Sequence, residues 1–313
     1  MFKFIIDHVF QLIIVIFCVT TLTFFLVRLA PGDPALIMLK ANDVAPPAEA
    51  VDALREELGL TKSLSEQYIQ WMKNVFTGHW GNSFVSGEPV IEELFVKLPA
   101  TFELAIAGLI VMLAVTFGLG IATSIYEKGI VDRLGRTAAL LGSAIPPFLI
   151  GFLCIYIFSV QLGWLPSMGR SNWQNIILPA ITLGLGLGTM HARVLRVHLL
   201  ELMKQPFVKA SKARGFSNAH ILMFQLVKHA FLVIATLTGT NFAFMLGGSI
   251  IVESIFSWPG LGRYIIDSIN MRDYPVIQGY VIFASILFVV IHTVVDLIYL
   301  IVDPRLRVQI GGR

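Results

Sequence analysis

The sequence predicts an all-α polytopic membrane protein, and three observations support this prediction. Of the 313 residues, 56% are hydrophobic and only 14% are charged, whereas a soluble domain has about 45–50% apolar and about 25% charged residues. Six separate stretches are apolar over most or all of the length of about 20 residues that a helix needs to cross a bilayer. The charged residues gather in the connections between these stretches, and their sign differs from one connection to the next.

The six expected spans lie in this order along the chain: Val9–Val27, Thr101–Ile125, Thr137–Gln161, Ile176–Met190, Ala230–Val252 and Gly279–Val302. The first span is longer than the apolar region of a signal peptide, and no clear small-residue cleavage site follows it, so we expect it to be retained. The chain then divides into residues 1–30 with the first span, an outer helical segment at 31–100, and a five-helix core at 101–313.

The charges of the connections predict which side of the membrane each one faces. Cytoplasmic connections of membrane proteins carry an excess of Lys and Arg. The connections Tyr126–Arg136 and Arg193–His229 are basic, as is the tail after Asp303. Segment Pro31–Ala100 instead holds ten acidic residues and five Lys or Arg. We therefore expect both termini and the two basic connections in the cytoplasm, and the acidic segment outside.

The outer segment carries start and stop signals for two helices. Pro46 and Pro47 precede a stretch that ends near Gly59, and this order suits a helix with Pro at its start and Gly just past its end. Ser63 and Glu66 have the spacing of a capping box. The helix that follows has one apolar face, which either lies on the outer surface of the protein or binds an external partner.

Small and helix-disturbing residues mark the third and fourth spans. Pro146 and Pro147 remove backbone donors and predict a bend in the third span, either as a packing kink or as the wall of a cavity. Gly184 and Gly188 are four residues apart and predict a face on which another helix packs closely.

Ionisable residues within or beside the spans are candidates for a translocation path or for structural pairs, because a charge in hydrocarbon needs a partner or a cavity. They are Glu103, Glu253 and Asp296. His191 and His292 stand alone, and Cys18 and Cys154 lie in apolar stretches, so we expect all four to pack rather than bind metal. The sequence predicts no metal site and no cofactor in this chain.

The connection Arg193–His229 contains seven Lys or Arg and a single acid, Glu201. Within it, small and basic residues are interleaved over Lys209–Gly215, and a short helix here would let another protein's backbone approach closely. Gly215 can adopt positive φ and turn the chain after this helix. Phe207 and Phe216 flank the helix as apolar anchors. A basic helix lying at the membrane interface is the alternative interpretation.

Sequence motifs along nearly the whole chain resemble the permease subunits of ABC importers of the dipeptide, oligopeptide and nickel class. The motifs are Leu29–Pro34, Glu57–Leu60, Leu98–Ala105, Ile177–Ala180, Glu253–Arg263, Arg272–Gln278 and Asp303–Arg305. The Trp-Pro-Gly-Leu-Gly stretch beginning at Trp258 is the most specific of them. The resemblance implies the type I importer permease fold in a bacterial inner membrane.

The resemblance also implies a role for the basic connection, as the coupling loop that docks on a cytoplasmic ATPase. The residues that match the coupling segment are Lys209, Ala210, Ser211, Lys212, Ala213, Arg214, Gly215 and Phe216. Gln225–Ala230 departs from the family's usual His-x-Leu-Arg-Asn-Ala, which puts the detailed contacts with the ATPase in question but leaves the docking itself.

The expected partners follow from the same resemblance and from a missing motif. The chain has no phosphate-binding loop, so we expect it to be non-catalytic and ATP to be bound by partner subunits. The partners are a second, homologous permease subunit, one or two cytoplasmic ATP-binding subunits, an external substrate-binding protein and the lipid bilayer, with no nucleic acid.

The cargo that we expect is nickel or a nickel chelate, with di- and oligopeptides as the alternative. The connection at 162–174 is short, as in nickel permeases, although no cluster of metal ligands supports this choice. Two other classes of function have less support from the sequence. An intramembrane enzyme would need a motif such as His-Glu-x-x-His, which the sequence lacks. A channel or secondary transporter would show charged filter rings or an inverted repeat, and we find no convincing example of either.

Overall fold

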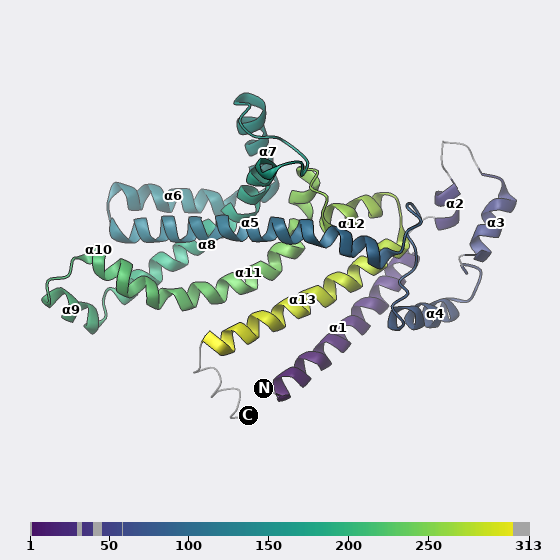
Figure 1. Cartoon of the computed structure of the whole chain (residues 1–313), viewed down its shortest axis with the longest axis horizontal. Helices are drawn as coiled ribbons and strands as arrows, with labels where there is room; N and C mark the ends of the chain where they lie inside the picture. Colours follow the sequence, from purple (N-terminus) through teal and green to yellow (C-terminus); the bar gives the residue numbers. More distant parts are fainter. Residues whose placement is uncertain (1, 30–32, 40–45, 58, 303–313) are drawn as a thin grey trace. The chain divides into compact units, whose positions relative to one another are not determined.

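A computed structural model describes residues 2–29, 33–39, 46–57 and 59–302 of the chain (Figure 1). In this part of the chain the regular elements are helices, accompanied by one isolated β-bridge between Asn82 and Pro89. The elements are α1 (Phe2–Leu29), α2 (Pro34–Leu39), α3 (Ala48–Glu57), α4 (Leu64–Phe76), α5 (Val90–Ile125), α6 (Ile130–Ala144), α7 (Pro147–Cys154), η1 (Ile155–Gln161), η2 (Trp173–Ile176), α8 (Ile177–Leu202), α9 (Pro206–Ala213), α10 (Asn218–Ile221), η3 (Leu222–Leu226), α11 (Val227–Ile255), α12 (Leu261–Asn270) and α13 (Tyr274–Val302). The all-α prediction is confirmed.

Four of the described helices are long and apolar enough to cross a membrane: Phe10–Leu29, Val90–Ile125, Trp173–Leu202 and Tyr274–Val295. A fifth candidate is formed by α6 together with α7 and η1. The span expected at Ala230–Val252 falls within α11, where several side chains lie outside the described residues. The helices begin earlier or end later than the expected spans, because helices continue beyond the apolar stretch wherever their polar ends are solvated or packed.

The third expected span is not one straight helix. Helix α6 ends at Ala144, α7 begins at Pro147, and the two are bent by 106°. Pro146 and Pro147 account for the break, since neither has a backbone N–H to donate to the preceding turn. Helix α6 also begins at Ile130, so the connection expected at 126–136 is only a short turn before it.

The chain divides into two compact units, and the first comprises Met1–Pro99 and Gly260–Val290. Its core contains Val90, Leu94, Leu261, Val276 and Phe283. Helix α4 packs on α1: Tyr68 Oη and Thr21 Oγ1 are 2.8 Å apart, and the Phe24 ring lies 5.3 Å from Tyr68 and 5.5 Å from Trp71. Tyr68 and Trp71 of the predicted apolar face therefore contact α1, whereas Leu64 at the start of the same helix is 55% exposed.

The predicted ends of the outer helices are confirmed. Helix α3 stops at Glu57, and Gly59 has a φ of +65°. The capping box of α4 is formed in both directions: Ser63 Oγ accepts from the Glu66 N–H at 3.4 Å, and Glu66 Oε2 accepts from the Ser63 N–H at 3.1 Å. These caps satisfy backbone donors that a helix start leaves unpaired.

The second unit comprises Ala100–Pro259 and Ile291–Arg313. Helix α8 lies at its centre and packs against α6, α7 and α11. It also approaches α5 closely, because a Cβ on Gly184 would collide with the Gly108 carbonyl oxygen, and one on Gly188 would lie 2.9 Å from the Met112 carbonyl oxygen. The small-residue face predicted at these two glycines is confirmed.

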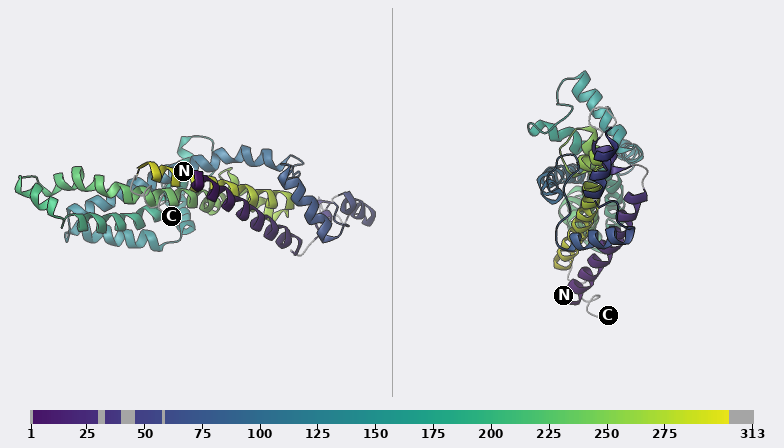
Figure 2. Two further views of the ribbon diagram at one scale, coloured as in Figure 1. Left: turned by 90° about the horizontal axis from the view of Figure 1, so that it is seen from below. Right: turned by 90° about the vertical axis from the view of Figure 1, so that its right-hand side faces the viewer.

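Two apolar clusters fill the second unit. One gathers around Trp258, whose indole N–H donates to the Ala100 carbonyl oxygen at 2.8 Å, and includes Leu104, Ile150 and Leu178. The other joins α8, α9, α10, η3 and α11. Helices α9 and α10, drawn in green, lie at one end of this unit (Figure 1 and Figure 2). The second cluster thus supports the element that carries the predicted coupling segment.

Candidate functional site

The basic segment 193–229 is largely helical. Helix α8 continues to Leu202, and the chain then turns through Gln205, which has extended backbone angles (φ −69°, ψ 149°). Pro206 opens α9, where its missing N–H is harmless because the first helical N–H groups have no partner within the helix. The expected short helix is confirmed as α9, although it begins at Pro206, three residues before Lys209, and ends at Ala213.

The end of α9 is held by a Schellman motif. The Phe216 N–H donates to the Ser211 carbonyl oxygen at 3.3 Å, and the Gly215 N–H donates to that of Lys212 at 2.9 Å. Gly215 has a φ of +86°, as the sequence predicts, and a Cβ there would meet no atom within 4 Å. Glycine is favoured here by backbone conformation rather than by crowding.

Helix α9 is anchored by one apolar side chain that sequence reasoning did not single out. Val208 is fully buried and packs in the cluster that contains Leu199, Ile221 and Leu226. The other face of the segment is exposed, and it carries Lys209, Ala210, Lys212, Ala213, Arg214 and Gly215. The sequence signal for Val208 is its residue type, because it is the only aliphatic side chain larger than alanine between Pro206 and Ala213.

The two expected anchors, Phe207 and Phe216, are 40% and 43% exposed. Each ring lies against a histidine: Phe207 is 5.6 Å from His229, and Phe216 stacks on His220 at 4.9 Å. Phe224 extends the second stack at 4.8 Å from His220. The two rings therefore flank α9 as expected in sequence, but neither is buried, and both form partly exposed aromatic edges beside the helix.

Helix α9 is also tied to the segment that departs from the family pattern. Ser211 Oγ donates to Gln225 Oε1 at 2.9 Å. Gln225 lies in η3, a π-helical turn that leads into α11. Gln225, which stands where the family usually has His, thus accepts a hydrogen bond from α9 within this chain. This role is separate from any contact that the residue makes with an ATPase.

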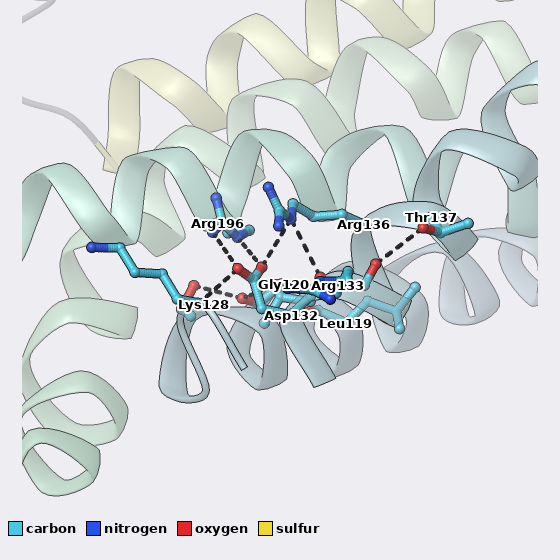
Figure 3. A network of polar contacts seen from close by, with 10 residues as sticks. Leu119, Gly120, Lys128, Asp132, Arg133, Arg136, Thr137 and Arg196 are labelled. Carbon is cyan, nitrogen blue, oxygen red and sulfur yellow. Dashed lines mark hydrogen bonds and ion pairs between the residues drawn. The ribbon is translucent and has the colours of Figure 1, made fainter. Parts of the chain in front are cut away.

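A buried charge cluster holds the same end of the unit, and Figure 3 shows both arginines directed toward its central carboxylate. Asp132 in α6 is only 1% exposed, and Arg196 in α8 donates to its two oxygens at 2.8 and 3.0 Å. Arg136 lies 3.4 Å from Asp132, and the Lys128 N–H donates to it at 3.0 Å. Sequence reasoning missed this cluster, although an acid inside a basic connection signals it.

The three candidate acids of the translocation path have different surroundings. Glu103 is exposed and forms an ion pair with Arg170, whose Nε donates at 2.8 Å. Glu253 is fully buried and accepts from Thr101 at 2.8 Å and from Ser249 at 2.9 Å. The side chain of Asp296 lies outside the described residues. Glu103 and Glu253 therefore have separate polar partners within the second unit.

The histidine and cysteine residues form no group of metal ligands in the described part of the chain. His191 is fully buried, with Nε2 3.2 Å from the side-chain nitrogen of Asn241, while its Nδ1 has no hydrogen-bond partner among the residues that the structure describes. Cys154 packs in the cluster around Trp258, whereas Cys18 is exposed on α1. His191 and Cys154 are thus both buried within the second unit.

Comparison with known families matches the chain over nearly its full length. A family model described as "Binding-protein-dependent transport system inner membrane component" matches residues 97–308. The corresponding model for the N-terminal part of such membrane components matches residues 1–105. The first match covers the second unit as far as residue 308 and the whole of α13, and it therefore includes α9 and the Asp132 cluster.

Curated relatives and solved structures agree with this assignment. The glutathione transport system permease proteins of Salmonella paratyphi A and Escherichia coli are 37% and 36% identical over 98% of this chain and 99% of their own. The structure of an inward-facing methionine ABC transporter has a TM-score of 0.57 at 17% identity and covers 68% of this chain and 97% of its own. An amino acid ABC transporter has a TM-score of 0.53 at 16% identity, covering 67% of this chain and 94% of its own. The chain therefore belongs to the inner-membrane components of binding-protein-dependent transport systems, the non-catalytic, multi-pass permease subunits of ABC importers.

Proposed function

We propose that the chain forms half of the translocation path of an importer of small, glutathione-like peptides. The observation that carries this proposal is the 37% identity, over 98% of the chain, to glutathione permeases. These relatives favour the peptide alternative over nickel, the cargo expected from the short connection at 162–174. Connecting loops tolerate insertions and deletions among homologues, so the length of the 162–174 loop is a weak guide to cargo.

Family membership implies ATP-binding subunits and a substrate-binding protein as partners. We propose further that a second, homologous permease subunit completes the path and that one or two ATP-binding subunits supply the energy. In this proposal the partner subunits bind ATP, and this chain contributes no cofactor. One subunit with about six spans is too small to enclose a peptide path alone.

The coupling segment Lys209–Phe216 transmits the movement in this proposal. Small side chains at Ala210 and Ala213 let a partner's backbone approach the exposed face of α9, and the neighbouring bases orient it. Val208 and the Ser211–Gln225 hydrogen bond fix α9 to α10, η3 and α11. A displacement of the docked ATPase therefore moves these helices as a body, which is the form of a rigid two-state switch.

The acids Glu103, Glu253 and Asp296 remain candidates for contact with the cargo. The Glu103–Arg170 pair is exposed in the second unit and offers both charges to a zwitterionic peptide. Glu253 is buried among hydroxyl groups and would first have to lose the hydrogen bonds from Thr101 and Ser249. We therefore propose Glu103 before Glu253 as a residue that contacts the cargo.

The test is uptake of radiolabelled glutathione by cells that carry the whole transporter, with small peptides and nickel as competitors. We expect uptake that peptides inhibit and nickel does not. Nickel uptake without peptide uptake would overturn the cargo and keep the permease assignment.

The coupling segment is tested in the same assay with Gly215→Asp, which we expect to abolish uptake while the permease remains in the membrane. Gly78→Asp is the matched control, because Gly78 also has positive φ (+77°) and open space around it but lies in the outer segment. Equal uptake by Gly215→Asp and the wild type would remove the coupling role from this segment.

A further inference from the structure

The charge cluster around Asp132 contains more positive than negative charge. Two guanidinium groups share its single carboxylate: Arg196 donates to the two oxygens at 2.8 and 3.0 Å, and Arg136 Nε lies 3.4 Å from one of them. One of the two positive charges therefore has no matching carboxylate within the cluster. Arg136 is 51% exposed, and Figure 3 shows a terminal nitrogen of each guanidinium group directed away from Asp132. The cluster can therefore accept a second anion from outside.

Three further bases lie beside this cluster, and all are exposed: Lys128, Arg133 and Arg193. Arg133 lies three residues before Arg136 on α6, and Arg193 stands in the same relation to Arg196 on α8. Residues three apart are neighbours on a helix surface, and α6 packs against α8. The turn before α6 adds one exposed acid, Glu127. Five bases thus lie together with two acids, and the group as a whole attracts anions.

The cluster lies where two spans are expected to leave the apolar part of the membrane. The apolar stretch of the third span begins at Thr137, directly after Arg136, and that of the fourth ends at Met190, three residues before Arg193. Helix α8 then continues to Leu202, about 9 Å beyond the cluster along its axis, before the chain turns toward α9. These positions correspond to the level of the lipid headgroups, and along α8 they are closer to the membrane than the coupling segment is.

An exposed apolar stripe runs along α6 beside the cluster. Ile130, Leu134 and Leu141 are 76%, 65% and 57% exposed, and their spacing of four and seven residues puts them on one face of the helix. Around the helix, Arg133 lies between this stripe and the buried side that carries Asp132. A ligand that covers both the stripe and the bases must combine apolar chains with an anionic head, which is the chemistry of an anionic phospholipid.

We propose that Arg133, Arg136 and Arg193 bind the phosphate of an anionic phospholipid, whose acyl chains lie along the apolar stripe of α6. Arginine pairs with phosphate through two parallel hydrogen bonds, and basic pockets between membrane helices hold lipid headgroups. A zwitterionic lipid also carries an ammonium group, which the five bases repel, so the site selects the anionic lipid. The site follows from the position of the chain in a membrane and does not depend on the cargo.

The test is titration of the purified whole transporter in detergent with phosphatidylglycerol, read by native mass spectrometry, with phosphatidylcholine as the zwitterionic reference. We expect the wild type to bind phosphatidylglycerol more tightly than phosphatidylcholine. Arg136→Gln and Arg193→Gln should each weaken phosphatidylglycerol binding by about tenfold, the usual cost of a hydrogen bond to a charged partner. Neither should change the binding of phosphatidylcholine. Arg196 is left in place because Asp132 needs it.

Arg263→Gln is the matched control, because it removes the same charge from α12 of the first unit. Arg263 is 40% exposed and lies 3.6 Å from Asp267, four residues away, much as Arg136 lies 3.4 Å from Asp132. It should bind phosphatidylglycerol as the wild type does. Thermal unfolding of each variant shows whether it is folded. Arg193→Gln leaves the contacts of Asp132 intact, so it keeps the test valid if Arg136→Gln fails to fold.

Equal affinity of the wild type for the two lipids would overturn the site, as would phosphatidylglycerol binding that both variants retain. Displacement of the lipid by millimolar inorganic phosphate would overturn it in favour of a free anion. Loss of the ATP-binding subunits from Arg136→Gln, with phosphatidylglycerol still bound, would overturn it in favour of a protein partner at the same bases.

Discussion

Gly184 illustrates how closely two helices of the second unit approach each other. A methyl group at this position would meet the Gly108 carbonyl oxygen and would lie 2.9 Å from the Met112 nitrogen, both of which are backbone atoms of α5. Backbone atoms cannot rotate away as side chains do. We expect Gly184→Ala to destabilise the permease by about 1–3 kcal/mol or more, the usual cost of overpacking a core.

The measurement is the thermal unfolding midpoint of the purified transporter in detergent. Gly118→Ala provides the comparison, because Gly118 lies in α5 with nothing within 4 Å of the added carbon. It should be neutral or slightly stabilising, since Ala favours a helix over Gly by about 1 kcal/mol. Equal midpoints for the two variants would show that α5 and α8 are not in close contact.

The structural role of a residue could be predicted from the sequence where it depends on near neighbours in the chain. It could not be predicted where it depends on a contact with a residue far away in the sequence. The capping box at Ser63 and the positive φ at Gly215 depend on neighbours three to five positions away, so the sequence contains the whole motif. Asp132 acquires its meaning from Arg196, 64 residues further on.

At the scale of elements, the Asp132–Arg196 pair fixes the start of α6 to α8. Because Asp132 is 1% exposed, removing Arg196 leaves a carboxylate in a poorly solvated place with only Arg136 and one N–H nearby. We expect Arg196→Met to destabilise the permease by about 3 kcal/mol, as for other broken buried pairs. The double variant Asp132→Asn with Arg196→Met should regain much of this loss.

The exposed pair Arg170–Glu103 is the control for this prediction. Its side chains are 41% and 43% exposed, and exposed ion pairs contribute about 0–1 kcal/mol. Glu103→Gln should therefore hardly change the unfolding midpoint. A large effect at Glu103 together with a small one at Arg196 would contradict the burial argument for the Asp132 cluster.

The third span, which is broken between α6 and α7, shows which features of a helix could be predicted from the sequence and which could not. Hydropathy gives the length of apolar chain between Thr137 and Gln161, and the paired prolines mark a bend near Pro146. The bend of 106° depends on how α7 packs against α8 and α11. Such tertiary contacts lie outside a local sequence window, so the position of the bend was predictable and its angle was not.

At the scale of the whole molecule, the proposed mechanism requires α9 and the outer segment to face opposite sides of the membrane. A matched pair of substitutions tests this arrangement: Ala53→Cys in α3 and Ala213→Cys in α9 replace the same small, exposed residue type. Both are made after Cys18→Ser and Cys154→Ala have removed the native thiols. A membrane-impermeant maleimide should label Ala53→Cys in intact spheroplasts and Ala213→Cys only after permeabilisation.

The two positions test different predictions. Ala53 tests the side of the outer segment, and Ala213 tests whether α9 faces the cytoplasm, as the coupling role requires. The positive-inside rule depends on the short basic connections and says little about a long segment such as 31–100. Labelling of Ala53→Cys from outside therefore adds information that charge alone does not give. Labelling of Ala213→Cys in intact spheroplasts would contradict the coupling role outright, since α9 would then be out of reach of a cytoplasmic ATPase. Protection of Ala213→Cys by the ATP-binding subunits in permeabilised cells would place the docking surface on the exposed face of α9.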